Sequence, residues 1–287
     1  MMQFVHRLRT AWPWLPAFRA VAETEHLPTA AHQLDVVPSS LSRTVKLLED
    51  ELGVALFDRT GKTLVLNDAG RTILAAVRDA MRSLDEAFTR AAGNELRGNI
   101  GAVASSDLAY TLLAPACAEL VSSQPDLCTS LVIASDAAVP GLLLRGDADV
   151  AVVLTPPDQP DLVVTELANW SRGVYGASER AATSRCVAVG TPSNHADDGW
   201  PAGCERGIAT WAPDERAALE ICARTELVTV AFDVITRSSG YAGRLVRLES
   251  PTISTKPLFL VYRRAVGVHR RTDALIEAIR VIAARLG

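Results

Sequence analysis

Apolar residues recur at helical spacing over residues 16–92 and give way to short strand-like runs from residue 99 onward. In the first region one β-like stretch, LFDRTGKTLVLN, interrupts a helical pattern rich in Ala and Leu. In the second region, runs such as NIGAVAS, TSLVIAS and DVAVVLT alternate with helical stretches such as LAYTLLAPACAELVSS. That alternation is typical of an α/β domain with a largely parallel sheet. The change falls at GNELRGN, residues 93–99, where glycines and asparagines are expected to end a long helix.

The segment from Pro38 to Gly53 predicts an amphipathic helix. At 100° per residue its apolar side chains fall within a narrow arc, formed by Leu41, Val45, Leu48 and Leu52. The opposite side carries, from the start of the helix to its end, Ser39, Arg43, Lys46 and Asp50. This order opposes the helix dipole, which favours acids first, and it suits a helix whose amino-terminal half approaches phosphates and base edges. An ordinary amphipathic surface helix would show the same apolar stripe, and that alternative stays open.

A shorter helix and a hairpin flank this segment. Upstream, LPTAAHQLDV predicts a short helix whose alanines allow close helix crossing, and a turn at 35–37 leads to Pro38, a favourable first-turn residue. Downstream, LFDRTGKTLVL predicts a hairpin with its tip at 60–62. Together these elements predict a winged helix-turn-helix, with Arg59 and Lys62 beside the DNA backbone or minor groove.

Asn67 is a predicted amino-terminal cap for a long helix that runs to about residue 92. This helix carries a heptad seam, with steps of four and three, made of Ile73, Val77, Ala80, Leu84, Ala87 and Ala91. Because the helix follows a small domain and precedes a glycine hinge, we expect the seam to pair two subunits. The alternative is that the stripe packs against its own domain.

Formal net charge is −4, with 12 Lys and Arg against 12 Asp and Glu over residues 1–98, and 17 against 21 over residues 99–287. The chain therefore lacks the general basic excess that favours nucleic-acid binding. Any DNA affinity must come from a few well-placed cations and from pairing of subunits.

The histidines are scattered, and neither GxSxG nor HExxH occurs. The five cysteines, at 117, 128, 186, 204 and 222, form no CxxC or Cys/His cluster. These patterns argue against an enzyme, a zinc site or a bound cofactor. Buried, inert thiols are one interpretation, and a redox pair such as Cys204 and Cys222 is the other.

Two further sequence patterns indicate in which cellular compartment the protein is expected. No stretch of about 18 uninterrupted apolar residues occurs, and MMQFVHRLRTAWPW at the start lacks the apolar core and cleavage site of a secretory signal. We therefore expect a cytoplasmic protein without a membrane partner.

In open α/β sheets, ligands bind beyond the carboxyl ends of the strands. Strands predicted at 99–104, 130–134 and 150–154 place polar residues at these ends. The effector-binding candidates are Ser105, Ser106, Ser135, Asp136 and Thr155. Hydroxyls suit a small anion or polar acid, whereas the aspartates allow an amine-bearing ligand. Ser and Asp are also ordinary helix caps, which is the competing interpretation.

Taken together, these segments resemble a LysR-type transcriptional regulator. The resemblance rests on AFRAVAE near the start, LSRTVKLLEDELGVALFDRTGK at 41–62 and LNDAG at 66–70, and it continues through QPDL at 124–127, LLRGDADVAVV at 143–153, GRLVRL at 243–248 and PLFLVYRR at 257–264. It covers nearly the whole chain, and its amino-terminal motif is the specific one. The resemblance implies a winged helix-turn-helix, a linker-helix dimer often assembled into tetramers, and an effector domain like a periplasmic binding protein.

Carried over position by position, the resemblance implies DNA contacts from Thr29, Ser39, Ser40, Ser42, Arg43, Lys46, Arg59 and Lys62. The chain also departs from the family. Where the family commonly has Ser-Gln-Pro before the recognition helix, this sequence has Val37-Pro38-Ser39, which removes a hydroxyl cap and an amide able to read a base.

We therefore expect an α+β multidomain protein with three parts. These are a winged helix-turn-helix domain at 1–66, a linker helix and hinge at 67–98, and a two-lobed α/β effector-binding domain at 99–287, with lobe I at 99–158 and 256–287 and lobe II at 159–255. The expected function is sequence-specific DNA binding controlled by a small-molecule effector, with a homodimer or homotetramer and RNA polymerase as partners. A cysteine-based redox sensor of the same fold is the alternative, whereas a free-standing solute-binding protein is disfavoured by residues 1–92.

Overall fold

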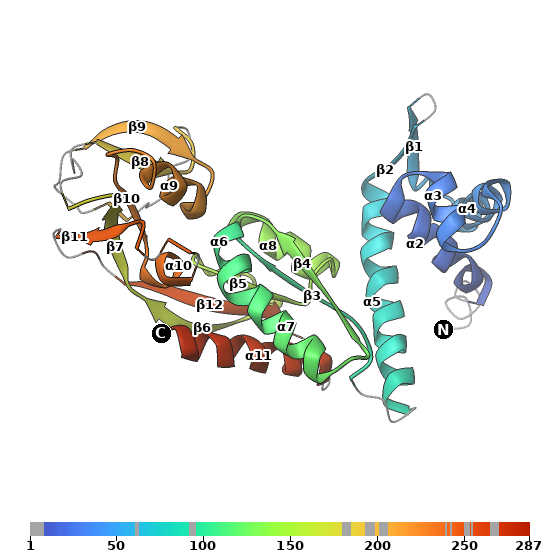
Figure 1. The fold of residues 1–287 in the computed structure, drawn as a ribbon. Helices are drawn as coiled ribbons and strands as arrows, with labels where there is room; N and C mark the ends of the chain where they lie inside the picture. Colours follow the sequence, from blue (N-terminus) through green and yellow to red (C-terminus); the bar gives the residue numbers. More distant parts are fainter. Residues whose placement is uncertain are drawn as a thin grey trace. The chain divides into compact units, whose positions relative to one another are not determined.

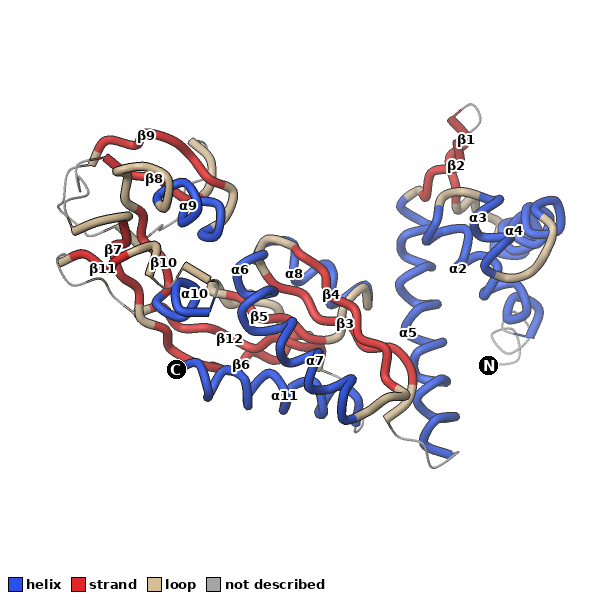
Figure 2. The backbone as a smooth tube through the Cα atoms, viewed as in Figure 1, coloured by secondary structure: helices blue, strands red, loops and turns tan. Residues whose placement is uncertain are grey.

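The computed structural model describes residues 9–60, 63–91, 96–179, 185–192, 199–200, 206–238, 240–241, 243–249, 253, 255–264 and 270–287. The molecule divides into two compact units, Met1–Gly93 and Asn94–Gly287 (Figure 1). The first unit is mainly helical, and the second is built from sheets covered by helices, as the apolar pattern predicts (Figure 2).

The first unit is a winged helix-turn-helix followed by one long helix. Its labelled elements are η1 (Trp12–Trp14), α2 (Leu15–Thr24), α3 (Leu27–Gln33), α4 (Pro38–Leu52), β1 (Phe57–Thr60), β2 (Thr63–Leu66) and α5 (Asp68–Ala91). Helix α4 ends where predicted, because Gly53 adopts a left-handed φ of 69° that a glycine takes without strain. Asn67 caps α5 through its side-chain oxygen, which accepts a hydrogen bond from the Gly70 amide at 2.9 Å.

Among its described residues, one hydrophobic core holds the first unit together. Its fully buried larger side chains are Phe18, Leu41, Leu48 and Leu56. Phe18 meets Phe57 edge to face, with ring centroids 5.8 Å apart, so the wing is anchored on α2. Helix α5 contributes Leu74 and Val77 to the same core. The predicted apolar stripe of α4 is therefore buried as expected.

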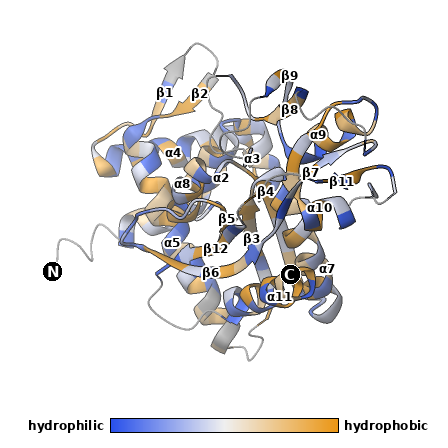
Figure 3. Cartoon of the chain, turned by 90° about the vertical axis from the view of Figure 1, so that its left-hand side faces the viewer, coloured by the Kyte–Doolittle hydropathy of each residue, from blue (hydrophilic) through white to orange (hydrophobic). Residues whose placement is uncertain are grey.

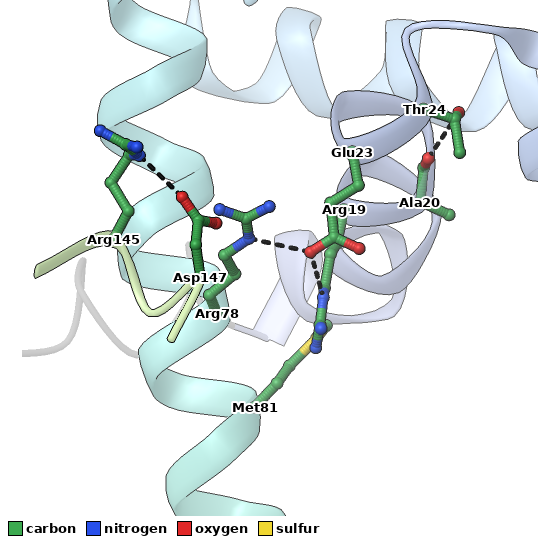
Figure 4. Close-up of polar contacts among 8 residues, drawn as sticks. All are labelled: Arg19, Ala20, Glu23, Thr24, Arg78, Met81, Arg145 and Asp147. Atoms are coloured by element: carbon green, nitrogen blue, oxygen red, sulfur yellow. Dashed lines mark hydrogen bonds and ion pairs between the residues drawn. The ribbon is translucent and has the colours of Figure 1, made fainter. Parts of the chain in front are cut away.

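Ion pairs and side-chain caps fix the surrounding elements. The Glu23 carboxylate receives the Nε groups of both Arg19, at 2.9 Å, and Arg78, at 2.8 Å (Figure 4). Since Arg78 belongs to α5 and Glu23 to α2, this pair ties the long helix to the helix-turn-helix. Near the end of α4, Glu49 Oε1 accepts the Leu56 amide at 2.8 Å and so positions the start of the wing.

A five-stranded sheet in the order β4-β3-β5-β12-β6 forms the centre of lobe I in the second unit. The strands are β3 (Gly98–Ala104), β4 (Leu127–Ile133), β5 (Val150–Val153), β6 (Leu162–Trp170) and β12 (Lys256–Arg263). β3 pairs in parallel with β4 and β5, and β12 is antiparallel to both of its neighbours. The sheet is therefore mixed, with two parallel and two antiparallel pairings, and the prediction of a largely parallel sheet holds only for its β4-β3-β5 half.

Helices cover both faces of this sheet. Ile100, Ala102 and Ala104 of β3 face a core shared with α7 (Ala114–Ser123) and α11 (Arg270–Leu286). Val103 faces the opposite core, which α8 (Val139–Arg145) closes. The alternation follows from the two-residue period of a strand, and burial on both faces explains why β5 is a continuous apolar run. β6 lies at the edge of the sheet and is only partly buried, although part of it is coloured as hydrophobic in Figure 3.

In the described part of lobe II, the chain forms two smaller sheets and two helices. The sheets are β10-β7-β11 and β8-β9, built from β7 (Arg172–Gly176), β8 (Arg185–Val189), β9 (Gly207–Ala212), β10 (Thr229–Phe232) and β11 (Val246–Leu248). The helices are α9 (Glu215–Cys222) and α10 (Asp233–Ser238). The predicted start of lobe II at residue 159 is too early, because β6 pairs with β12 in the five-stranded sheet. The chain leaves lobe I only at Ser171, between β6 and β7.

Among the residues the structure describes, no helix combines the length and apolar character needed to cross a membrane.

Candidate DNA-binding and effector-binding sites

The polar face of α4 is turned to solvent. The exposed residues among the predicted DNA contacts on this helix are Ser39, Ser40, Arg43 and Lys46. Ser42 is half-buried, so its hydroxyl stands at the margin of the face. Lys46 Nζ lies 3.4 Å from Asp50 Oδ1 on the next turn, an exposed ion pair that is weak in water and easily exchanged for another anion.

The other predicted DNA contacts lie outside α4. Thr29 is exposed on α3, and its hydroxyl lies 2.7 Å from Nδ1 of His26. Arg59 lies in β1, where its backbone pairs with Leu64. Its side chain is outside the described part of the molecule, as is the whole of Lys62. The positions of these two cations relative to α4 therefore remain a prediction.

The predicted dimer seam on α5 is divided between two environments. Val77 is 4 % exposed in the core of its own unit, and Ile73 packs against the same core. The prediction that the whole seam faces a partner is therefore wrong for Val77, which is buried in its own unit, whereas Ile73 is half-buried there. Further along, Leu84, Ala87 and Ala91 are exposed, and Phe88 beside them is 69 % exposed. Ala80, between the two parts, is half-buried.

Two of the effector-binding candidates contact each other. Oδ2 of Asp136 accepts hydrogen bonds from the backbone amides of Leu154, at 2.9 Å, and Thr155, at 2.8 Å. Burial raises the pKa of the Asp136 carboxyl, an effect that these two amides oppose. Asp136 thus holds the loop after β5 in place. Ser135 and the Thr155 side chain are exposed beside it.

Ser106, at the end of β3, contacts lobe II. Its hydroxyl donates to Oδ2 of Asp214 at 2.6 Å, and the other oxygen of Asp214 accepts the Ala217 amide as the amino-terminal cap of α9. Ser105 is half-buried and its carbonyl accepts the Ala109 amide. The strand-end pattern predicts that Ser106 is open to a ligand, whereas in the structure Asp214 supplies the carboxylate that it binds.

Asp107 makes a second link between the lobes. Its two carboxylate oxygens accept the amides of Glu215, at 2.9 Å, and Arg216, at 3.2 Å, which are first-turn amides of α9 without intrahelical partners. Arg216 in turn donates to Thr111 Oγ1 at 3.2 Å and stacks over the Tyr110 ring. We call the set Ser106, Asp107, Tyr110, Thr111 and Asp214–Arg216 the α6–α9 contact, after α6 (Ser106–Leu108).

Glu215 is the acid at the centre of the α6–α9 contact, and the residue as a whole is half-buried. Its Oε2 accepts the Phe232 amide at 2.9 Å. Burial, followed by the charge of Asp107, raises the pKa of Glu215 to about 8, against the opposing effects of that amide and of Arg172. The pKa of Asp107 is also raised, first by burial. Asp107 and Asp214 at strand and helix ends have the sequence signal of helix caps, but nothing local indicated that they would join two lobes.

The described cysteines lie in unreactive surroundings, with one exception. Cys117, Cys186 and Cys222 are buried. Burial raises the pKa of the Cys222 thiol to about 12, with neighbouring Cys186 adding to the effect, so its reactive thiolate is scarce at neutral pH. Cys128 is exposed on β4. Cys204, the other half of the predicted redox pair, lies outside the described residues.

The chain thus combines a winged helix-turn-helix unit with a long helix and a two-lobed α/β domain, and winged helix-turn-helix units are a DNA-binding motif. Comparison with protein families agrees. The model for "Bacterial regulatory helix-turn-helix protein, lysR family" matches residues 12–71, and that for "LysR substrate binding domain" matches residues 93–282. The chain therefore belongs to the LysR family of transcriptional regulators, and the families that it matches are regulators rather than enzymes.

The sequence identity between this chain and individual relatives is low. The chain is 29 % identical over 158 residues to the regulator DgdR of Burkholderia cepacia, covering 54 % of each chain. It thus spans about half the length of the curated relatives it matches. Among solved structures, a full-length variant of OxyR from Pseudomonas aeruginosa has a TM-score of 0.74 at 19 % identity, covering 93 % of this chain and 94 % of that one. Full-length LysG from Corynebacterium glutamicum with bound effector Arg has a TM-score of 0.64 at 20 % identity, covering 95 % and 97 %. Such likeness shows a shared fold.

Proposed function

We propose that this chain is a sequence-specific DNA-binding transcriptional regulator whose helix α4 lies in the major groove. The observation that carries the proposal is the exposed polar face of α4, with Ser39, Ser40, Arg43 and Lys46 turned outward above a buried apolar stripe. A recognition helix needs an apolar stripe that anchors it in a core and an opposite face whose cations and hydroxyls are exposed to DNA. The exposed outer part of α5 supports pairing of two copies, so that two recognition helices read a pseudo-palindromic site.

The second unit, in this proposal, senses a small-molecule effector between its two lobes. Family membership supports this, and so does the position of Ser105, Ser135 and Thr155 at the ends of parallel strands. Ser106 and Asp136 lie beside them and are held by hydrogen bonds within the chain. Burial and the raised pKa of Cys222 favour small-molecule sensing over thiol oxidation. Effector binding would shift the population of lobe arrangements and thereby the spacing of the paired recognition helices.

A regulator of this kind acts where the chromosome is transcribed, so we propose a cytoplasmic location and RNA polymerase as a further partner.

The test is a mobility-shift titration of the full chain with the intergenic DNA upstream of its own gene at two salt concentrations. Arg43→Ala is expected to weaken binding to all sequences and to reduce the slope of log affinity against log salt by about one, because one phosphate contact is lost. Arg224→Ala serves as the control, since Arg224 is an exposed cation of lobe II. If Arg43→Ala matches the wild type in affinity and slope, α4 is not the recognition helix.

A further inference from the structure

The turn that leads into α4 is held in one conformation by backbone contacts. Asp35 adopts a left-handed φ of 52°, which Asp tolerates better than most residues. The next amide, that of Val36, donates to the Ala31 carbonyl at 3.0 Å, and the Leu34 amide donates to Ala30 at 3.2 Å. The turn is therefore tied to the buried alanines of α3, and the residues that follow it are presented at a defined position.

Two of those residues expose apolar side chains. Val36 is 44 % exposed and Val37 is 62 % exposed. Val37 occupies the amino-terminal cap of α4 with extended backbone, and its carbonyl accepts the amides of Ser40 and Leu41. Its side chain cannot cap the helix, although a Ser or Thr at this position would stabilise it by roughly 1 kcal/mol. Neither burial nor capping explains a valine at this position.

We propose that Val37, supported by Val36, reads the methyl group of thymine in the major groove. This inference rests on the proposed DNA-binding function. The amino-terminal residues of a recognition helix face base edges, and thymine is the base that presents a methyl group there. A valine offers two methyl groups in a nearly fixed rotamer and no hydrogen-bonding group, so it contacts a methyl group favourably and gains nothing from a polar base edge.

The neighbouring side chains suit the same arrangement. Ser39 and Ser40 stand exposed on the first turn, and Arg43 stands on the next turn of the exposed face. Their hydroxyl and guanidinium groups can hold phosphates or polar base atoms while Val37 covers a methyl group. The replacement of the family's polar residues by Val37 at the start of α4 then changes which base the helix recognises and does not abolish base recognition.

The experiment compares two forms of one DNA. The full-length wild-type protein selects its preferred sequence from a random pool, and that sequence is prepared once with thymine and once with uracil at every thymine. Uracil pairs as thymine does but lacks the methyl group. The affinity of the wild-type protein for the uracil DNA is expected to be lower by roughly fourfold for each methyl group that Val37 contacts. This is the loss expected when a contact that buries about one CH₂ group is removed. Val37→Ser is expected to bind both forms about equally.

Val54→Ser is the control, because Val54 is likewise an exposed valine, at 44 % against 62 % for Val37, but follows the end of α4. It should keep the wild-type preference for thymine. The slope of affinity against salt should be unchanged in Val37→Ser, because no charge is removed. Serine is a better cap than valine, so misfolding is not expected.

The proposal would be overturned if uracil lowered the affinity of the wild type and of Val37→Ser by the same factor. It would also be overturned if the wild type bound thymine and uracil DNA with equal affinity. Failure of the wild type to select any sequence would instead overturn the proposed function and this inference together.

Discussion

The polar groups of α4 and those of the α6–α9 contact differ in what they bind. On α4, hydroxyls and cations point outward from a helix that its apolar face already anchors. At the α6–α9 contact, Ser106 and Asp107 are hydrogen-bonded to Asp214 and to the first amides of α9. The first surface is exposed, and we propose that it binds DNA, whereas the second joins two lobes of the same chain. A polar residue at the end of a strand or helix therefore identifies a position where polar contacts form, but not their partner.

The largest expected effect comes from pH, through Glu215 at the α6–α9 contact. Because its folded-state pKa of about 8 lies above the ordinary value of 4.5, the folded state binds the proton more tightly than the unfolded state. The stability from this group is full below about pH 4.5, falls as pH rises toward 8, and changes no further above that. The slope is up to about 1.4 kcal/mol per pH unit within the window. Urea unfolding of the second unit across this pH range measures it.

Glu215→Gln is the control for this titration, since a neutral amide can still accept the Phe232 amide. Its stability should be independent of pH over the same window, apart from the contribution of other groups. A variant that kept the full wild-type slope would show that Glu215 is not the titrating group.

Asp107→Ala tests the link between the lobes. It removes the acceptor of two otherwise unpaired amides, so we expect a loss of roughly 2–3 kcal/mol in the free energy of unfolding. Hydrogen exchange at the amides of Glu215 and Arg216 should accelerate strongly, while the Ala218 amide inside α9 stays protected. Asp149→Ala is a matched control, because Asp149 accepts the Gly101 amide, and both residues belong to lobe I. Fast exchange at residues 215 and 216 in the wild type would mean that the contact is not formed in solution.

Smaller changes in stability and self-association are expected from substitutions in the two parts of the α5 seam. Val77→Ala should cost about 2 kcal/mol of stability in the first unit, because a buried side chain leaves a cavity. Phe88→Ala should change that stability by less than about 0.5 kcal/mol and should weaken self-association instead. Analytical ultracentrifugation at several concentrations distinguishes them. If Phe88→Ala leaves the association constant as it is in the wild type, the exposed part of α5 is not the pairing surface.

The smallest expected effect on stability belongs to Ser39→Ala on α4. Since Ser39 is exposed, the free energy of unfolding should change by less than about 0.5 kcal/mol, while the selected DNA sequence becomes less strict at one position. Selection of bound DNA from a pool of random sequences, followed by sequencing, measures this change in sequence preference. An unaltered preference would remove Ser39 from the base-reading residues.

Much of the fold could be predicted because its signals are local. The apolar arc of α4, the glycine that ends it at 53 and the Asn67 cap of α5 each depend on neighbours within a few residues, and the structure confirms all three. Apolar runs alternating with helices likewise predicted strands β3, β4 and β5, although β4 begins at Leu127 rather than at residue 130. Periodicity reports which face of an element is apolar.

Periodicity does not report which other part of the protein, or which partner, packs against the apolar face. The predictions about packing were therefore incomplete. The heptad stripe of α5 was visible, but only the packing of the first unit decided that Val77 lies in its own core while Phe88 is exposed. Strand β6 pairs with β12, far along the chain, so its membership of lobe I could not be inferred from its own residues.

The candidate sites divide in the same way. Sequence by itself determined the exposed face of α4, because one helix supplies all of its residues and a fixed angle of about 100° per residue relates them. Only the tertiary structure decided that Asp107 caps α9, because the amide that it accepts belongs to Glu215, 108 residues away. A hydrogen bond between distant segments depends on where the sheets and helices place both groups, and no spacing along the chain encodes that position.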